Sequence, residues 1–148
     1  MIVPKGGEHN LHRNLPMTFA SIRLIAADIT TMVAFYELVI GHSAEWLAPQ
    51  FAEIVTSGAR IAIGSTETVA LFMEGSAEPG ANRTAILEFR VEDVDAEFTR
   101  LKGKVDIVIE PKTLPWGNRT LQFRDPEGTI ISLFTPVTEA ARVRFGSL

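Results

Sequence analysis

The side chains best suited to chemistry are charged residues within two apolar segments. Arg23 lies in Ser21–Ala26, and Glu88 and Arg90 lie in the segment 86–91. Both segments alternate as half-buried strands do, which puts all three charges on the face opposite the helix-packing residues. Two interpretations stay open. Arg23 and Glu88 form a structural ion pair, or these charges bind polar groups of a ligand, with Glu88 as an acid or base.

Other catalytic chemistry has little support in the sequence. The chain has no cysteine, which excludes thiol nucleophiles, disulfides and cysteine-bound zinc. His42 is the one histidine in the patterned part of the chain, and it follows Gly41 at a predicted helix end, where a capping role is expected. A serine nucleophile would need a histidine base beside Ser21 or Ser132. The sequence has neither a phosphate-binding glycine loop nor a nucleophile-elbow motif.

The composition is that of one globular domain. The chain has 148 residues, of which 46% are apolar and 22% are charged. The net charge of −4 argues against nucleic acid or an anionic membrane as partner. The apolar runs are too short to span a bilayer, and we expect a cytoplasmic protein. Residues 1–17 have no apolar period, so we expect a flexible extension in which His9 and His12 bind no metal.

Strand and helix patterns alternate from Thr18 onward. A strand over Ser21–Ala26 precedes a helix that begins after Asp28 and ends at Gly41. Strands follow near 43–47, 51–56 and 60–64; the segment 66–73 fits either a helix or a strand; and the loop 75–82 separates two halves.

The second half repeats this order. A strand near 86–91 precedes a helix capped by Asp93, and further strands fall near 105–109, 119–123 and 129–134. An offset of 65 residues carries Asp28 onto Asp93 and keeps the apolar parity of the first strands. We therefore expect one domain over 18–137, made of similar modules at 18–74 and 84–137. The tail 138–148 is expected to lie over a partner or to fray.

Two motifs of the second half carry a family resemblance. They are Leu114-Pro115-Trp116-Gly117-Asn118-Arg119 and Phe123-Arg124-Asp125-Pro126-Glu127-Gly128-Thr129. Together with the duplicated module, they resemble the vicinal oxygen chelate superfamily, which includes glyoxalases, bleomycin-resistance proteins and extradiol dioxygenases. The resemblance implies an α+β fold, in which two paired βαβββ modules form a half-open, cup-shaped sheet with helices on the convex side. It also implies a homodimer.

The resemblance further implies where a metal would lie. Enzymes of this superfamily hold a divalent ion in the cup, and the matching ligand positions in this sequence are Ser21, Ile86 and Ser132. A catalytic divalent site needs imidazole or carboxylate ligands, which these three residues lack. We therefore expect no metal and no other cofactor.

Strand parity and the resemblance together predict a ligand site in the cup. Its lining is mostly apolar and aromatic, with a few hydrogen-bonding groups, as in many small-molecule pockets. Two tryptophans at the rim either pack structurally or stack on a planar ligand. The predicted site residues are Ser21, Arg23, Trp46, Ile86, Glu88, Arg90, Trp116, Ser132 and Phe134.

Two functions remain open. The first is metal-independent binding: the protein sequesters an aromatic or polycyclic ligand in a cleft of a homodimer, as bleomycin-resistance members do. The alternative is a glyoxalase-like lyase or isomerase, or a dioxygenase-related enzyme, that uses Glu88 as acid or base or has a metal site elsewhere. A cup filled by its own side chains would leave only an interaction module.

Overall fold

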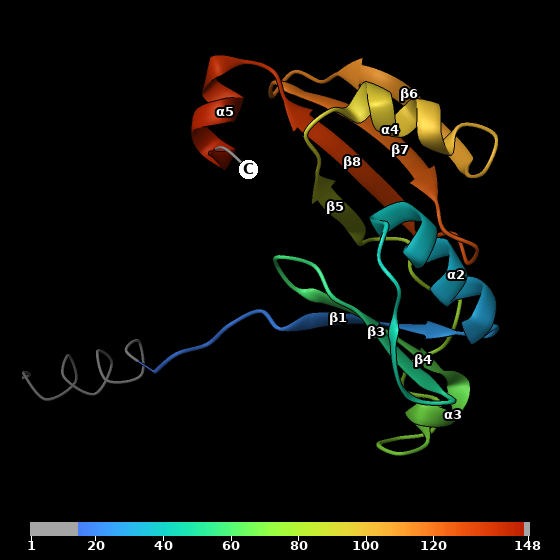
Figure 1. The fold of residues 1–148 in the computed structure, drawn as a ribbon. Helices are drawn as coiled ribbons and strands as arrows, with labels where there is room; N and C mark the ends of the chain where they lie inside the picture. The colour runs from blue at the N-terminus through green and yellow to red at the C-terminus, as the bar shows by residue number, and fades with distance from the viewer. Residues whose placement is uncertain (1–14, 147–148) are drawn as a thin grey trace, which may run out of the picture.

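The computed structural model describes residues 15–146. The expectations for residues 1–14, which include His9 and His12, and for residues 147–148 lie outside the described part of the chain. Two four-stranded sheets form the framework, with strand orders β1-β4-β3-β2 and β5-β8-β7-β6 (Figure 1). The identical order confirms the duplication that the 65-residue offset predicts.

The first module runs from β1 to α3. Its elements are β1 (Ser21–Ala26), α2 (Ile29–Ile40), β2 (Glu45–Ala48), β3 (Phe51–Ile54), β4 (Arg60–Ser65) and α3 (Thr66–Val69). The second module has β5 (Ile86–Arg90), α4 (Val94–Leu101), β6 (Asp106–Thr113), β7 (Asn118–Arg124), β8 (Ile130–Pro136) and α5 (Glu139–Phe145). In each module the first strand pairs in parallel with the last, and the other pairs are antiparallel.

Both long helices begin where the sequence predicts, and α2 also ends there. The Asp28 carboxylate accepts hydrogen bonds from the backbone N–H and the hydroxyl of Thr31, and these bonds lower the pKa of Asp28. Asp93 caps α4 in the same way through the N–H of Ala96. Helix α2 ends before Gly41, which has a left-handed φ of 81°. The N–H of Gly41 donates a hydrogen bond to the Glu37 carbonyl.

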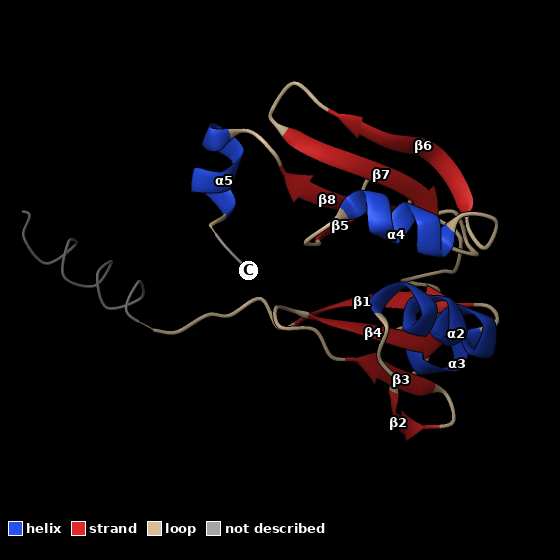
Figure 2. Ribbon diagram, turned by 45° about the horizontal axis from the view of Figure 1, so that its top comes forward, coloured by secondary structure: helices blue, strands red, loops and turns tan. Residues whose placement is uncertain are grey.

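One apolar core joins the two modules. It contains Tyr36 of α2, Leu101 of α4 and Phe123 of β7, all of them buried. Helix α2 contacts both sheets, since the Phe35 ring lies edge-on to Phe123 with 6.0 Å between ring centroids. Figures 1 and 2 show the second module above the first, with α2 at their junction. The helix that caps the first sheet therefore also fixes the second one.

The structure resolves one ambiguous segment, 66–73, and corrects the prediction for the C-terminal tail. The ambiguous segment begins with the one-turn helix α3. The tail, which the sequence predicts to lie over a partner or to fray, forms α5, capped by Thr138 and packed against β8 of its own chain. Among the described residues, no helix is long and apolar enough to cross a membrane.

Candidate functional site

The signature turn after β7 fastens the two modules together. The Asp125 carboxylate accepts the backbone N–H groups of Glu127 and Thr129, and its second oxygen accepts the Tyr36 hydroxyl at 2.7 Å. The Glu127 carboxylate accepts the N–H of Ala27, just before α2, at 2.9 Å. Gly128 has a φ of 95°, as the turn requires. The motif that carries the resemblance therefore has a structural role that needs no ligand.

A cleft of about 1010 Å³ lies between the modules. Its first wall is the C-terminal end of α2 (Val39 to His42), with Ile22 and Ile61 of the first sheet. Its second wall is β5, continued by Val91, and the Arg100 side chain of α4. The cleft follows β5 along its unpaired edge, since in the described residues β5 pairs only with β8.

Three predicted site residues line this cleft. Ile86 is 47% exposed there, Glu88 is exposed, and Arg90 is half-buried. No described side chain forms an ion pair with Glu88, so the suggested Arg23–Glu88 pair does not exist in this structure. Glu88 is thus an accessible carboxylate on a wall that combines apolar side chains with Arg90 and Arg100.

Two further predicted residues lie next to β5 on β8. The register pairs Glu88 with Ser132 and Arg90 with Phe134, which puts all four on one face of the second sheet, away from α4. We call this the inner face, and from β7 it also includes Asn118, Thr120 and Gln122. Ser132 and Phe134 are buried, at 1% and 6% exposure.

Ser132 and Phe134 do not line the cleft, and neither do the other four predicted residues. Ser21 and Arg23 lie on the first sheet, where the Arg23 guanidinium lies 4.8 Å from the centroid of the Phe51 ring. Trp46 is exposed on β2, at the far edge of that sheet, and Trp116 is 56% exposed in the turn between β6 and β7. Neither tryptophan is therefore in place to stack on a ligand bound in the cleft.

Sequence reasoning missed several lining residues. Strand parity separates the two faces of β5, yet Leu87, Phe89 and Val91 also line the cleft, because it runs along a strand edge. His42 lines the cleft too, although the sequence predicts a capping role for it at the end of α2. The only sequence signal that places His42 near the cleft is its position directly after Gly41, which ends α2.

The metal-ligand positions do not fit a divalent ion. Ile86 has no donor atom, and the hydroxyls of Ser21 and Ser132 are neutral. Residues 15–146 contain no cluster of three or more His, Cys, Asp or Glu side chains arranged to hold a metal. The donor set of the cup is therefore unsuited to the ion that the family implies.

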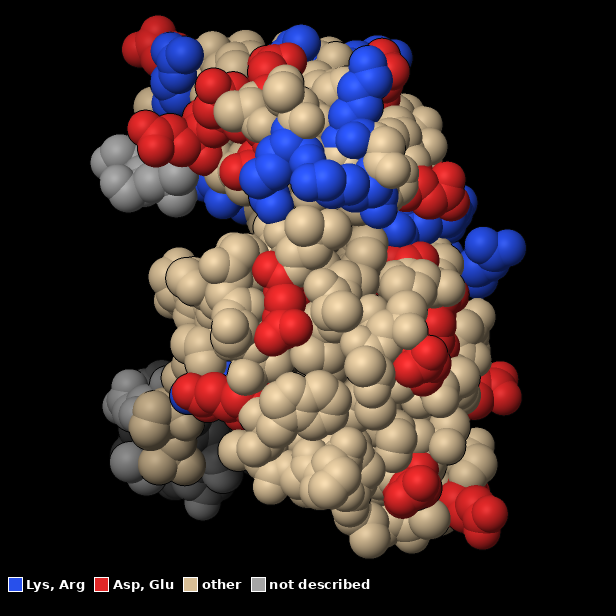
Figure 3. Space-filling model, turned by 45° about the vertical axis from the view of Figure 1, so that its right-hand side comes forward, with Lys and Arg blue, Asp and Glu red and all other residues tan. Residues whose placement is uncertain are grey.

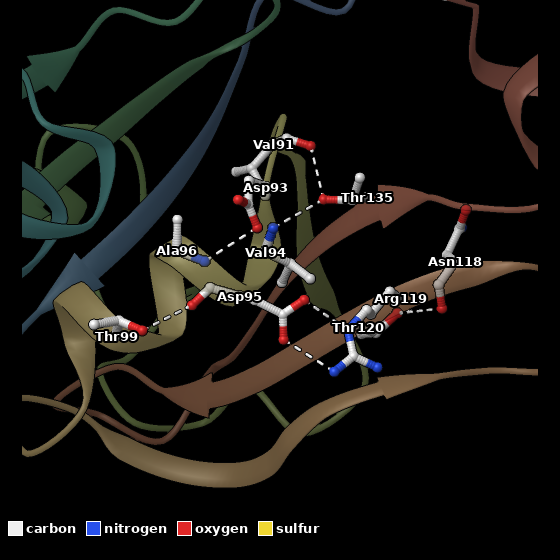
Figure 4. A network of polar contacts seen from close by, with 10 residues as sticks. All are labelled: Val91, Asp93, Val94, Asp95, Ala96, Thr99, Asn118, Arg119, Thr120 and Thr135. Carbon is white, nitrogen blue, oxygen red and sulfur yellow. Dashed lines mark hydrogen bonds and ion pairs between the residues drawn. The ribbon is translucent and has the colours of Figure 1, made fainter.

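Polar contacts hold α4 and β5 in place beside the cleft. The Thr135 hydroxyl of β8 accepts the N–H of Val94 and donates to the Val91 carbonyl, both at 3.0 Å (Figure 4). Arg119 of β7 pairs with both carboxylate oxygens of Asp95, which lowers the pKa of Asp95. These contacts fix the second wall of the cleft.

One protein-family model matches most of the described chain. The sequence profile of the Glyoxalase/Bleomycin resistance protein/Dioxygenase superfamily matches residues 18–133. An uncharacterised protein, YraH of Bacillus subtilis (strain 168), is 30% identical over 126 residues, which cover 80% of this chain and 98% of YraH.

Solved structures agree with the fold. A glyoxalase/bleomycin resistance protein/dioxygenase from Nocardioides has a TM-score of 0.71 at 19% identity, covering 91% of this chain and 95% of its own. A family enzyme from Burkholderia phytofirmans PsJN has a TM-score of 0.72 at 19% identity, covering 82% of this chain and 100% of its own. These similarities concern the fold alone.

Proposed function

Because the chain belongs to the glyoxalase/bleomycin resistance protein/dioxygenase superfamily, we propose that it is a metal-independent small-molecule binding protein. It sequesters an aromatic or polycyclic ligand, as bleomycin-resistance members do, and works as a homodimer. The observation that carries the proposal is the cleft of about 1010 Å³ between the modules. Its size is that of a pocket for a drug-sized molecule.

The chemistry of the cleft walls supports binding of an organic ligand. Ile22, Ile40 and Ile86 offer apolar surface to a ring system. Glu88 and His42 add polar groups that would orient such a ligand. Arg100 already forms hydrogen bonds with Glu97 and with the carbonyls at the end of α2. We therefore assign it a structural role in the cleft wall and no contact with the ligand.

A thermal-shift screen with neutral, cationic and anionic aromatic compounds tests the proposal. We expect at least one class to raise the melting temperature. Ile86→Lys should abolish that rise by placing a charge on the apolar wall. Val108→Lys, at a similarly exposed valine of β6 outside the cleft, should retain it. Trp116→Ala should also retain it, since Trp116 does not line the cleft.

Metal analysis distinguishes binding from the enzymatic alternative. We expect dialysis against a chelator to leave the melting temperature and the ligand-induced rise unchanged. Stoichiometric Ni, Zn, Fe or Mn retained by the purified protein would contradict the proposal, as would chemical conversion of a bound compound. Failure of every aromatic class to bind would contradict it as well.

A further inference from the structure

Helix α5 covers part of the inner face of the second sheet. The Phe145 ring packs on Phe134 with 4.9 Å between ring centroids, and Ala141, also in α5, is buried. The outward side of α5 bears Arg142, Arg144 and Val143, the last 79% exposed. The helix is seven residues long, so two side chains supply most of its apolar contact. Such a helix is held weakly.

The surface beneath and beside α5 is polar, and its polar atoms are poorly satisfied. Asn118, Thr120 and Ser132 of the inner face are all at most 4% exposed. The described residues contain four buried side-chain polar atoms without a hydrogen-bond partner, and three belong to this face: Arg90 Nε, Asn118 Oδ1 and Ser132 Oγ. Burying such atoms without partners destabilises a fold. A polar ligand would satisfy this face better than the apolar side chains of Ala141 and Phe145 do.

Arg90 links this face to the cleft. Its Nη1 donates a hydrogen bond of 2.9 Å to the Phe145 carbonyl, which holds the C-terminal end of α5. Arg90 lines the intermodule cleft and also a second cavity, of about 740 Å³, that lies between α5 and the ends of β5 and β8. None of the ion pairs in the described residues includes Arg90. A half-buried guanidinium whose acceptor is a neutral carbonyl is suited to a carboxylate.

We propose that Arg90 binds the carboxylate of an aromatic ligand and that α5 is a displaceable cover over this subsite. The inference rests on the proposed function and names the charge of its ligand. The ring system lies in the cleft, and the carboxylate replaces the Phe145 carbonyl on the guanidinium. Once α5 moves, Ser132 Oγ gains a partner on the ligand. Arg90 supplies the positive charge of this subsite, and Glu88 lies beside Ser132 on the same face.

The first test compares 2-naphthoate with its neutral isostere 2-naphthamide by isothermal titration calorimetry. We expect naphthoate to bind about tenfold more tightly, because a hydrogen bond to a charged group is worth that much or more. Arg90→Gln should remove this preference and leave naphthamide binding unchanged. Arg90→Lys keeps the positive charge but cannot bind a carboxylate through two nitrogens. This variant should retain part of the preference for naphthoate. Arg83→Gln, in the exposed loop before β5, is the matched control.

The second test concerns the cover. Phe145→Ala removes the ring contact with Phe134, so the open form becomes more populated and naphthoate should bind about fivefold more tightly. Val143→Ala, on the exposed side of α5, should bind as the unaltered protein does. Hydrogen exchange at the Arg142 and Gly146 amides, which close α5 in the free protein, should accelerate when naphthoate binds.

The outcomes separate this inference from the proposed function. If naphthamide binds as tightly as naphthoate to the unaltered protein, the carboxylate subsite is wrong and small-molecule binding stands. That comparison needs no variant, so it holds even if Arg90→Gln fails to fold. Slower exchange of the α5 amides on naphthoate binding, or weaker binding by Phe145→Ala, would overturn the displaceable cover. If neither compound binds, the carboxylate subsite is wrong, and the wider screen of neutral, cationic and anionic aromatic compounds decides the proposed function.

Discussion

At Asp125 a single carboxylate serves two parts of the molecule. It closes its own turn through the N–H groups of Glu127 and Thr129, and it receives the Tyr36 hydroxyl from the other module. The Tyr36 ring is fully buried, so its hydroxyl has no access to water. A hydrogen bond between a buried hydroxyl and a charged acceptor stabilises more than one between neutral groups.

Tyr36→Phe removes this bond and keeps the ring. We expect the free energy of unfolding to fall by about 2 kcal/mol, the range for a hydrogen bond to a charged group. Urea denaturation measures the change. Thr99→Val, which removes a hydroxyl bonded to the Asp95 carbonyl on an exposed helix face, is the control and should change stability by less than about 0.5 kcal/mol. Equal effects of the two substitutions would show that the Tyr36–Asp125 bond adds nothing particular.

The same tyrosine predicts a loss of stability at alkaline pH. Burial, reinforced by the charge of Asp125, raises the pKa of Tyr36 far above its ordinary value. The folded protein therefore holds this proton more tightly than the unfolded chain does. The resulting stability is full below about pH 10, the pKa of a free tyrosine, and falls as the pH rises above it.

This alkaline effect can be followed on one group, because Tyr36 is the only tyrosine of the chain. We expect the ultraviolet band of tyrosinate to appear only as the circular dichroism of the fold is lost. Tyr36→Phe should show a shallower decline in stability above about pH 10. A tyrosinate band that titrates near pH 10 while the protein stays folded would contradict the burial argument.

At the scale of elements, local signals predict most of the fold. Asp28 and Gly41 mark the ends of α2 in the sequence, and Asp93 marks the start of α4, because caps satisfy backbone groups within a few residues. Strand parity correctly assigns Ile22 and Leu24 to the core side of β1. These features depend on neighbours in the chain, so the sequence contains them.

Other features depend on contacts between distant segments. Helix α5 has no apolar stripe, and it is held by Phe134 and Arg90, which precede Phe145 in the chain by many residues. The cleft exists because α2 packs on the second sheet through Phe35 and Tyr36. No periodicity reveals that packing. The predicted site residues Ile86, Glu88 and Arg90 therefore line the cleft, whereas Trp46 and Trp116 lie away from it.

Arg100 is the element-scale contact most open to test. Its guanidinium donates to the Leu38 and Val39 carbonyls at the end of α2, at 2.6 and 2.9 Å, and also pairs with Glu97. The end of α2 forms one wall of the cleft. The contact with Arg100 therefore determines the shape of the cleft as well as the position of the helix end. Positive charge at a helix C-terminus also suits the helix dipole.

Arg100→Gln should lower the free energy of unfolding by about 1 kcal/mol, discounted for the partial exposure of the side chain. It should also speed hydrogen exchange of the Gly41 amide, which closes the last turn of α2. Lys104→Gln, an exposed charge beyond α4, is the control and should alter neither measurement. Unchanged hydrogen exchange at Gly41 in Arg100→Gln would mean that the Arg100 contacts do not stabilise the last turn of α2.

At the scale of the whole molecule, charge and apolar surface are unevenly spread. Between residues 15 and 82 the only lysine or arginine residues are Arg23 and Arg60. In Figure 3 lysine and arginine gather over the second module, above, while the first module, below, is largely uncharged with scattered acidic groups. After α3 the turn exposes Leu71, Phe72 and Met73 at 82%, 57% and 68%. Three such neighbours form an apolar patch of the kind that marks an interaction surface.

The proposed homodimer follows from this patch and is testable by sedimentation velocity. We expect the unaltered protein to sediment as a dimer in which each copy buries the 71–73 turn. Burying a large apolar side chain contributes about 1.5–3 kcal/mol, so the double variant Leu71→Glu and Phe72→Glu should weaken the dimer by about a hundredfold or more. Val143→Glu adds a charge at an equally exposed position on α5 and should leave the dimer intact. A monomeric unaltered protein would contradict the homodimer. A dimer that survives the double variant would move the interface elsewhere, and the unpaired edges of β1 and β5 would be the next surfaces to test.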